Sequence, residues 1–238
     1  MPPESTDRKT ALVTGANRGI GRQAALQLAT LGWHVLATTR PRSYSQLEKD
    51  EQLSQHANIQ TLPLDITDTH SIEQAVITIQ QHTASLDLLI NNAGIFIDHG
   101  ESILTVDDSS FLETFTTNTL GPIRLTRALV PLLARSQKAL VINLSSAAGS
   151  LTEMKDWSPA YSLSKTALNA ATRQLAAALE PKGITVCAVS PGWVQTDMGG
   201  PNATRTVEQA VDSLLQLLDL PREQLTARFL RDTEDHPW

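Results

Sequence analysis

Short apolar runs alternate with longer amphipathic stretches along almost the whole chain, and this alternation limits the possible folds more than any other feature. The apolar runs have the length and composition of strands and lie at residues 10–14, 34–39, 59–64, 86–91, 139–144 and 184–189. Between them, apolar residues recur at helical spacing over residues 20–31, 72–82, 111–134 and 161–179. Continuously apolar strands separated by helices are typical of parallel strands that are covered on both faces. The sequence therefore predicts an α/β fold: a doubly wound, mainly parallel sheet with helices on both faces.

Nothing in the sequence divides the chain into separate units. It has 238 residues, a length that single α/β domains reach, and it contains no repeat, low-complexity segment or Pro/Gly-rich linker. Residues 207–217 are expected to form a helix and residues 227–230 a last short strand. Residues 1–7 and those after Asp232 are expected to be loosely held. We therefore expect a single domain over residues 1–238 with a short flexible N-terminus.

The composition argues against several classes of function. The chain has 19 basic and 25 acidic residues, a net charge of −6, which disfavours binding to nucleic acid or to an anionic membrane. One cysteine, Cys187, excludes an internal disulfide framework, and the six histidines show no metal-ligand spacing, so we expect no metal. No apolar run approaches the ~20 residues that span a bilayer. The polar N-terminal stretch MPPESTDRK lacks the apolar segment of a secretory signal, which predicts a cytoplasmic protein.

A glycine-rich turn lies where the first predicted strand passes into the first helix and reads TGANRGIG over residues 14–21. Glycines let the backbone turn sharply and approach a pyrophosphate, while free N–H groups at a helix start face the anion. An ordinary strand-to-helix turn is the alternative interpretation. A mononucleotide P-loop is a poor match because no Lys-Ser/Thr follows the last glycine. The predicted phosphate-binding residues are Gly15, Asn17, Arg18, Gly19, Ile20 and Gly21.

The spacing Gly-x3-Gly-x-Gly is similar to that of the short-chain dehydrogenase/reductase family, and the resemblance covers roughly residues 9–200. It implies a Rossmann-type fold and a nicotinamide dinucleotide cofactor. At the end of the second predicted strand, where an acidic residue would bind the ribose hydroxyls of NAD, the chain reads TTRPR. Arg40 in this stretch, together with Arg18, could bind a 2′-phosphate instead. We therefore expect NADPH as the cofactor.

Small or polar residues follow the later strands, where ligands of open α/β sheets bind. The resemblance places Asp65 and Ile66 beside the adenine, although Asp65 could also simply cap the next helix. It assigns the NNAG stretch to the ribose and the PGWVQT stretch to the nicotinamide amide, with ordinary turn chemistry as the alternative in both cases. The corresponding cofactor-binding residues are Asn92, Ala93, Gly94, Pro191, Gly192, Val194 and Thr196.

The stretch YSLSK contains an acid that suits carbonyl reduction. Hydride transfer to a carbonyl leaves negative charge on the oxygen, which must then be protonated. Tyr161 and Lys165 are four residues apart and share a helix face, so the ammonium can lower the pKa of the phenol from its ordinary value of ~10. By resemblance, Tyr161 is the general acid, Ser146 orients the carbonyl oxygen, Lys165 also holds the ribose, and Asn118 completes a proton relay through a water molecule.

The sequence thus predicts an NADPH-dependent carbonyl reductase that acts on a small-molecule ketone or aldehyde. Two alternatives stay open: an alcohol dehydrogenase working in the oxidative direction, and a non-catalytic NADP-binding regulatory protein. The C-terminal stretch RFLRD lacks the Val-Asp-Gly-Gly element of ketoacyl-carrier-protein reductases and is similar to the small carbonyl-reductase-like branch. Loops at residues 96–104, 147–160 and 195–204 are expected to contact the substrate, with Trp157 and Trp193 as an apolar wall. A homodimer or homotetramer is compatible with the resemblance.

Overall fold

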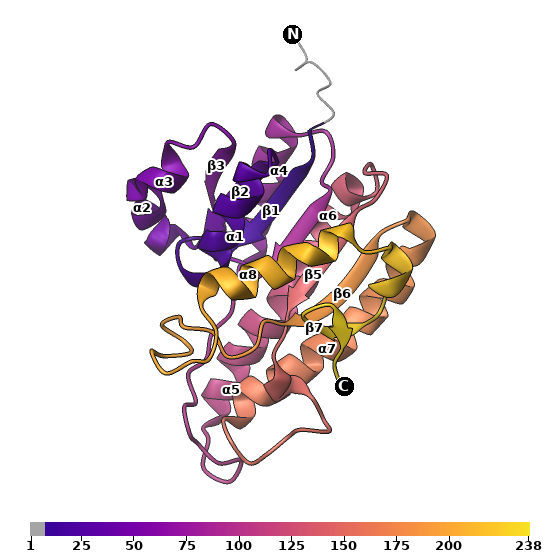
Figure 1. Cartoon of the computed structure of the whole chain (residues 1–238). Coiled ribbons are helices and arrows are strands. Elements are labelled where there is room, and N and C mark those ends of the chain that lie inside the picture. Colours follow the sequence, from indigo (N-terminus) through magenta and orange to yellow (C-terminus); the bar gives the residue numbers. More distant parts are fainter. Residues whose placement is uncertain (1–7) are drawn as a thin grey trace.

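One eight-stranded sheet runs through the computed structural model, which describes residues 8–238 (Figure 1). Its order is β3-β2-β1-β4-β5-β6-β7-β8, and every neighbouring pair is parallel except β7 and β8. This is the predicted Rossmann-type, doubly wound architecture, and the predicted flexible N-terminus lies outside the described residues. The strands are β1 (Thr10–Thr14), β2 (His34–Thr39), β3 (Ile59–Pro63), β4 (Leu88–Asn91), β5 (Leu140–Leu144), β6 (Thr185–Ser190), β7 (Phe229–Arg231) and β8 (Glu234–Asp235).

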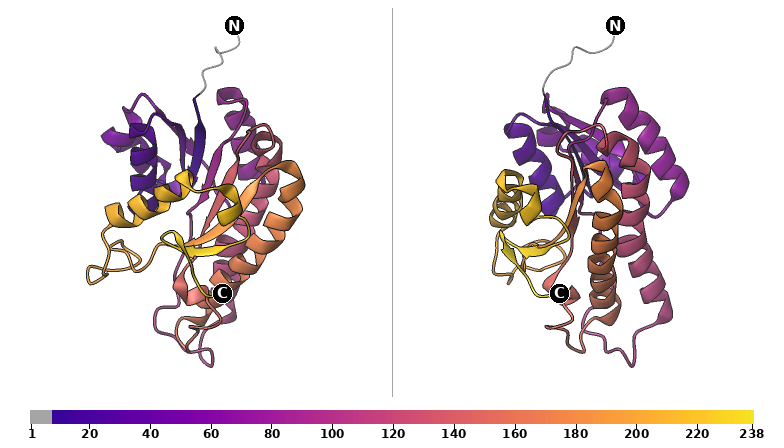
Figure 2. Two further views of the ribbon diagram at one scale, coloured as in Figure 1. Left: turned by 45° about the vertical axis from the view of Figure 1, so that its right-hand side comes forward. Right: turned by 90° about the vertical axis from the view of Figure 1, so that its right-hand side faces the viewer.

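Helices cover both faces of the sheet because alternate strand residues point to opposite sides (Figure 2). In β1, for example, Val13 joins the core beneath α1 and α8, while Leu12 joins the core beneath α4, α6 and α7. Among the helices of residues 8–238, none combines the length and the hydropathy that a membrane span requires. The α-helices are α1 (Gly19–Thr30), α2 (Pro41–Lys49), α3 (Glu51–Ser54), α4 (Thr69–His82), α5 (Asp108–Phe115), α6 (Gly121–Leu133), α7 (Pro159–Leu179) and α8 (Val207–Gln216). Shorter 3₁₀ turns are η2 (Ala147–Gly149), η3 (Glu180–Lys182), η4 (Leu217–Asp219) and η5 (Arg222–Gln224).

The long helical stretch predicted at residues 111–134 is helical in the structure but not uniformly α-helical. Between α5 and α6, the segment η1 (Thr116–Leu120) forms five residues of π-helix. Gly121 and Pro122 follow at once, and a Cβ atom at Gly121 would lie only 2.7 Å from the side chain of Ile66. The wider turn places Asn118 at the buried centre of this segment, a typical functional use of π-helical geometry.

The C-terminal residues are held in place by the rest of the fold. The prediction that residues after Asp232 are loosely held was therefore wrong. Strand β8 pairs with β7, and the His236 amide donates to the Phe229 carbonyl at 2.8 Å. The Trp238 ring packs 5.6 Å from that of Phe229 and takes the Arg173 guanidinium against its face at 5.3 Å. Aromatic packing of this kind stabilises a segment that its sequence position alone would leave frayed.

Candidate active site

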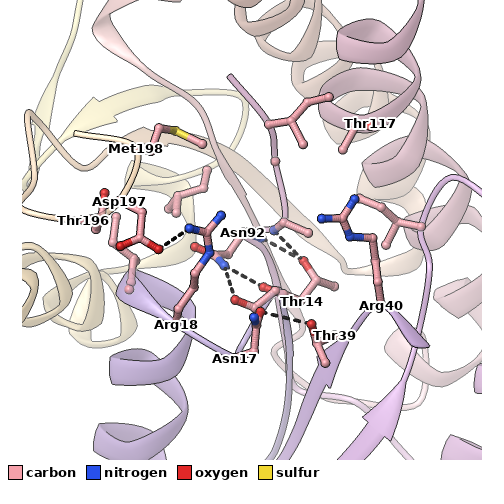
Figure 3. Close-up of a pocket in the computed structure, with 18 of the residues that line it drawn as sticks. Thr14, Asn17, Arg18, Thr39, Arg40, Asn92, Thr117, Thr196, Asp197 and Met198 are labelled. Atoms are coloured by element: carbon pink, nitrogen blue, oxygen red, sulfur yellow. Dashed lines mark hydrogen bonds and ion pairs between the residues drawn. The ribbon is translucent and has the colours of Figure 1, made fainter. Parts of the chain in front are cut away.

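The carboxyl ends of β1 to β6 surround a cavity of about 630 Å³, part of which is drawn in Figure 3. Its wall gathers residues from the turns and loops that follow these six strands, because parallel strands all end at the same edge of the sheet. Most of the predicted cofactor residues line it, namely Gly15, Asn17, Arg18, Gly19, Ile20, Arg40, Asp65, Ile66, Asn92, Ala93, Gly94, Tyr161, Lys165, Pro191 and Thr196.

Gly21, Gly192 and Val194 do not line the cavity. A Cβ atom on Gly21 would clash with the side-chain Nδ2 atom of Asn92 and lie 2.5 Å from the carbonyl oxygen of Gly15, so this glycine permits close packing behind the turn. Gly192 has φ +80°, and Val194 is buried, so both shape the loop after β6. The described residues contain no group of three His, Cys, Asp or Glu side chains that could hold a metal ion.

The turn between β1 and α1 is built to meet an anion. Gly15 and Gly19 have φ values of +65° and +54°, which other residues rarely adopt. Thr14 Oγ1 accepts hydrogen bonds from the backbone amides of Asn92 and Ala93, both at 3.0 Å, and so ties the turn to the end of β4. The residue before α1, Arg18, gives no side-chain cap, which leaves the first amides of the helix open toward the cavity. Phosphate oxygens fit such a helix terminus.

Two arginines, Arg18 and Arg40, bring positive charge to the wall of the cavity (Figure 3). Arg40 lies directly after β2 and half-buried, and burial first, then the neighbouring charge of Arg42, lowers its pKa. The charge of Asp65 raises the pKa of Arg40, and that of Arg18 lowers it further. Arg18 also forms an ion pair with Asp197 of the loop after β6, a contact that the sequence did not indicate. Excess positive charge beside a cavity fits a phosphate group.

Tyr161 and Lys165 lie in the first two turns of α7 and are both buried. The Lys165 Nζ atom is 5.7 Å from the centre of the Tyr161 ring and donates to the Leu144 carbonyl at 2.7 Å. Burial lowers the pKa of Lys165 to about 8. Burial also raises the pKa of Tyr161 above its ordinary value, and a hydrogen bond with the Ser146 hydroxyl partly offsets this rise. The phenol therefore stays protonated at neutral pH, as a proton donor must.

The two serines after β5 play different parts. Ser146 faces the Tyr161 hydroxyl and accepts a hydrogen bond from the Ala148 amide at 3.2 Å. Ser145 is buried and donates to the Asn169 side chain at 2.6 Å. Ser146 thus neighbours the phenol, whereas Ser145 is the serine of the pair that lines the cavity, and the catalytic role of Ser146 stays a prediction.

The Asn118 side chain bonds to the backbone of the loop after β4. Its Oδ1 atom accepts from the Ile95 amide and its Nδ2 atom donates to the Ile95 carbonyl, both at 2.8 Å. The same Nδ2 atom donates to Ser164 Oγ at 3.1 Å. Asn118 therefore holds the loop after β4 against α7, and its part in a proton relay stays a prediction.

Sequence reasoning missed two residues that touch Tyr161. The Phe96 ring lies 4.7 Å from the Tyr161 ring, and Asp98 accepts a hydrogen bond from the Tyr161 amide at 3.3 Å. Both follow the NNAG stretch in the predicted substrate loop, so the loop itself was identified. No local pattern singled out either side chain, because the contacts join residues more than sixty positions apart.

Comparison with known proteins identifies the family. A model of the short chain dehydrogenases matches residues 9–206, and the chain belongs to this family. Its fold superposes on an NADPH-bound carbonyl reductase from chicken fatty liver with a TM-score of 0.90 and 34% identity, covering 97% of this chain and 99% of that one. The carbonyl reductase Sniffer of D. melanogaster gives a TM-score of 0.88 and 32% identity over 97% and 100% of the two chains. The C-signal protein of Myxococcus xanthus is 39% identical over 62% of this chain and 89% of its own length.

The family and the site together define an oxidoreductase that acts on CH–OH and C=O groups, with a nicotinamide dinucleotide as its cofactor. The prediction of a short-chain dehydrogenase/reductase related to carbonyl reductases is confirmed.

Proposed function

We propose that this protein is an NADPH-dependent carbonyl reductase that transfers a hydride to a ketone or aldehyde. The observation that carries the proposal is a buried phenol, kept protonated by its surroundings, on the wall of the same cavity as an open helix terminus and two arginines. An acid and an anion-binding cradle in one cavity suit reduction by a bound dinucleotide.

Each residue has a defined part in this mechanism. The amides at the start of α1 bind the pyrophosphate, and Arg40 with Arg18 binds the 2′-phosphate. When bound, the nicotinamide supplies the hydride. The Ser146 hydroxyl donates a hydrogen bond to the carbonyl oxygen, and Tyr161 gives that oxygen its proton. Lys165 holds the ribose, and Asn118 takes part in returning a proton to the phenol.

The raised pKa of Tyr161 favours reduction over the oxidative alternative. An alcohol dehydrogenase uses the same residues in reverse, so its tyrosine must accept a proton as a phenolate. Burial raises the pKa of Tyr161 and thereby disfavours the phenolate. A purely regulatory NADP-binding protein has no use for a buried acid that faces its cofactor cavity.

The proposal is tested by following oxidation of NADPH and of NADH against a panel of ketones, aldehydes and quinones, with Tyr161→Phe in parallel. We expect carbonyl-dependent consumption of NADPH, slower consumption of NADH, and slow oxidation of the corresponding alcohols. If the protein binds NADPH but no carbonyl compound raises its NADPH consumption above that of Tyr161→Phe, a carbonyl reductase is excluded.

A further inference from the structure

Helix α7, which carries Tyr161, has no cap of its own at its amino end. Ser158, the residue before the helix, has φ +47° in the left-handed region, and its side chain does not cap the first turn. The amides of Ala160 and Tyr161 instead donate to a single oxygen, Oδ2 of Asp98, at 2.7 and 3.3 Å. Asp98 belongs to the loop between β4 and α5, so the cap comes from another element.

The Asp98 carboxylate is fully buried, with 0% of its surface exposed. Its second oxygen, Oδ1, has no hydrogen-bond partner among the described residues. Burying a charged group with half of its acceptors unused is costly. Serine is a residue type that caps helices at much lower cost, but the Ser158 hydroxyl accepts from the Gly100 amide and does not cap the first turn. Stabilising α7 is therefore an incomplete reason for this arrangement, which also joins two loops.

Further hydrogen bonds fasten the same two loops together. The Gly100 amide donates to Ser158 Oγ at 3.1 Å, and the Ser158 amide donates to the Glu101 carbonyl at 3.0 Å. Asp156 accepts from the Ile103 amide at 2.9 Å and from the Ser102 hydroxyl at 2.8 Å. The loop before α5 is thus bonded along its length to the segment that leads into Tyr161.

The first residues of the loop that carries Asp98 contact the other half of the site. Asn92, Ala93 and Gly94 line the cavity, and Asn92 is bonded to the turn between β1 and α1. Residues 92–98 therefore connect the two halves of the site: the Asn92 side chain bonds to the turn after β1, and the Asp98 side chain bonds to the amide of Tyr161. A displacement of about 1 Å at a reacting group can cost about 100-fold in rate, so the precision of this connection matters.

We propose that Asp98 is a positioning residue for Tyr161: its buried carboxylate fixes the backbone of Tyr161 relative to the loop that lines the cofactor cavity. The kinetic part of this inference rests on the proposed function. The structural part does not, because it concerns only where the phenol is held.

The chain contains two tyrosines, Tyr161 and Tyr44, so NMR of ring-labelled tyrosine gives two assignable signals. Tyr44 bonds to the Thr61 carbonyl at 3.1 Å on β3 and serves as an internal reference. We expect Asp98→Ala to shift the Tyr161 signal and leave that of Tyr44 unchanged. We expect its kcat to fall about 10- to 100-fold while the KM for NADPH stays within about twofold. Asp98→Asn keeps an acceptor for both amides and should recover most of the lost kcat.

Asp87→Ala is the matched control. Asp87 precedes the opposite end of β4 and accepts from the Thr10 amide at 2.7 Å and from the Ser136 hydroxyl at 2.6 Å. This variant should lose stability without moving the Tyr161 signal or lowering kcat. If Asp98→Ala does not fold, Asp98→Glu, which keeps the charge but shifts the carboxylate by one methylene, should still move the Tyr161 signal and lower kcat.

The proposal would be overturned if the Tyr161 signal does not move in Asp98→Ala or, where that variant does not fold, in Asp98→Glu. An effect on signal and kcat that Asp87→Ala reproduces would also overturn it. Absence of carbonyl-dependent NADPH consumption by the unchanged protein would refute the proposed function instead, and the labelled-tyrosine experiment would still decide whether Asp98 positions the phenol.

Discussion

Two networks of buried polar side chains lie between the sheet and its helices. They differ in how many of their hydrogen-bonding groups have partners within the protein. In the first, the Asn91 amide donates to Asn143 Oδ1 at 2.8 Å and to Thr126 Oγ1 at 3.1 Å, and the Asn143 amide donates to Thr172 Oγ1 at 2.8 Å. Asn91 and Asn143 are partners across β4 and β5. The network thus bonds α6, both strands and α7 to one another.

The second network contains Ser146, Tyr161 and Lys165, and it keeps hydrogen-bonding capacity for the cavity. An ammonium has three donors, and in the described part of the chain Lys165 gives a hydrogen bond to the Leu144 carbonyl. Burial shifts the pKa of Lys165 downward and that of Tyr161 upward, so both side chains are held in surroundings that disfavour their charged forms. Equal burial therefore serves stability in one network and reactivity in the other.

The sharpest test of this contrast removes one oxygen from the second network. Tyr161→Phe deletes the proton donor and leaves the ring contacts in place. General acid catalysis contributes about 10²- to 10⁴-fold, so we expect kcat to fall about 1,000-fold. The midpoint of thermal unfolding and the binding of NADPH, followed by its fluorescence, should stay close to those of the unchanged protein. Substantial residual turnover would show that the acid lies elsewhere.

Asn143→Ala makes the opposite change, in the first network. It removes two hydrogen bonds, so the Asn91 amide keeps only its bond to Thr126 and the Thr172 hydroxyl loses the donor that it accepts from. We expect the free energy of unfolding to fall by about 3 kcal/mol, and kcat for the folded enzyme to stay within about threefold. Urea unfolding and steady-state kinetics below the transition measure the two effects. A large drop in kcat with unchanged stability would mean that the two networks act as one.

A third test concerns Arg40, a charged residue that lies half-buried at the edge of the cavity. Arg40→Asp replaces attraction for a 2′-phosphate with repulsion. Hydrogen bonds to charged groups are worth about 1.5–3 kcal/mol, so we expect the KM for NADPH to rise about 10- to 100-fold. The KM for NADH, which lacks the phosphate, should change little. Equal changes for both cofactors would remove Arg40 from the phosphate site.

Much of this molecule could be predicted from sequence because its signals are local. Strand runs of β-branched residues, glycines in a turn, and a tyrosine four residues before a lysine all act over one or two turns of chain. The π-helix around Asn118 could not be predicted, because apolar spacing does not distinguish an inserted residue from a regular helix. The Asp98 cap and the packing of Trp238 depend on contacts between distant segments, which periodicity does not report.

The pH dependence of reduction tests the state of Lys165. Tyr161 keeps its proton because its pKa is raised, so Lys165, with a pKa of about 8, loses its charge first as pH rises. We expect kcat to be level below pH 8 and to fall toward tenfold per unit above it. The arginine in Lys165→Arg stays charged, so this variant should lack the decline even though its kcat is lower. A profile that stays level to pH 10 would show that the charge of Lys165 is not required.

The smallest expected effect concerns the ion pair between Arg18 and Asp197, whose side chains are 60% and 74% exposed. Exposed ion pairs contribute about 0–1 kcal/mol, so Asp197→Asn should change the affinity for NADPH by about fivefold at most. The direction is informative, because Asp197 and a 2′-phosphate would compete for the same guanidinium. Removing the carboxylate should therefore lower the KM for NADPH and leave that for NADH unchanged. If the KM for NADPH rises instead, Asp197 orients Arg18 toward the phosphate. The ion pair would then contribute to cofactor binding, as the residues of the second network contribute to reactivity.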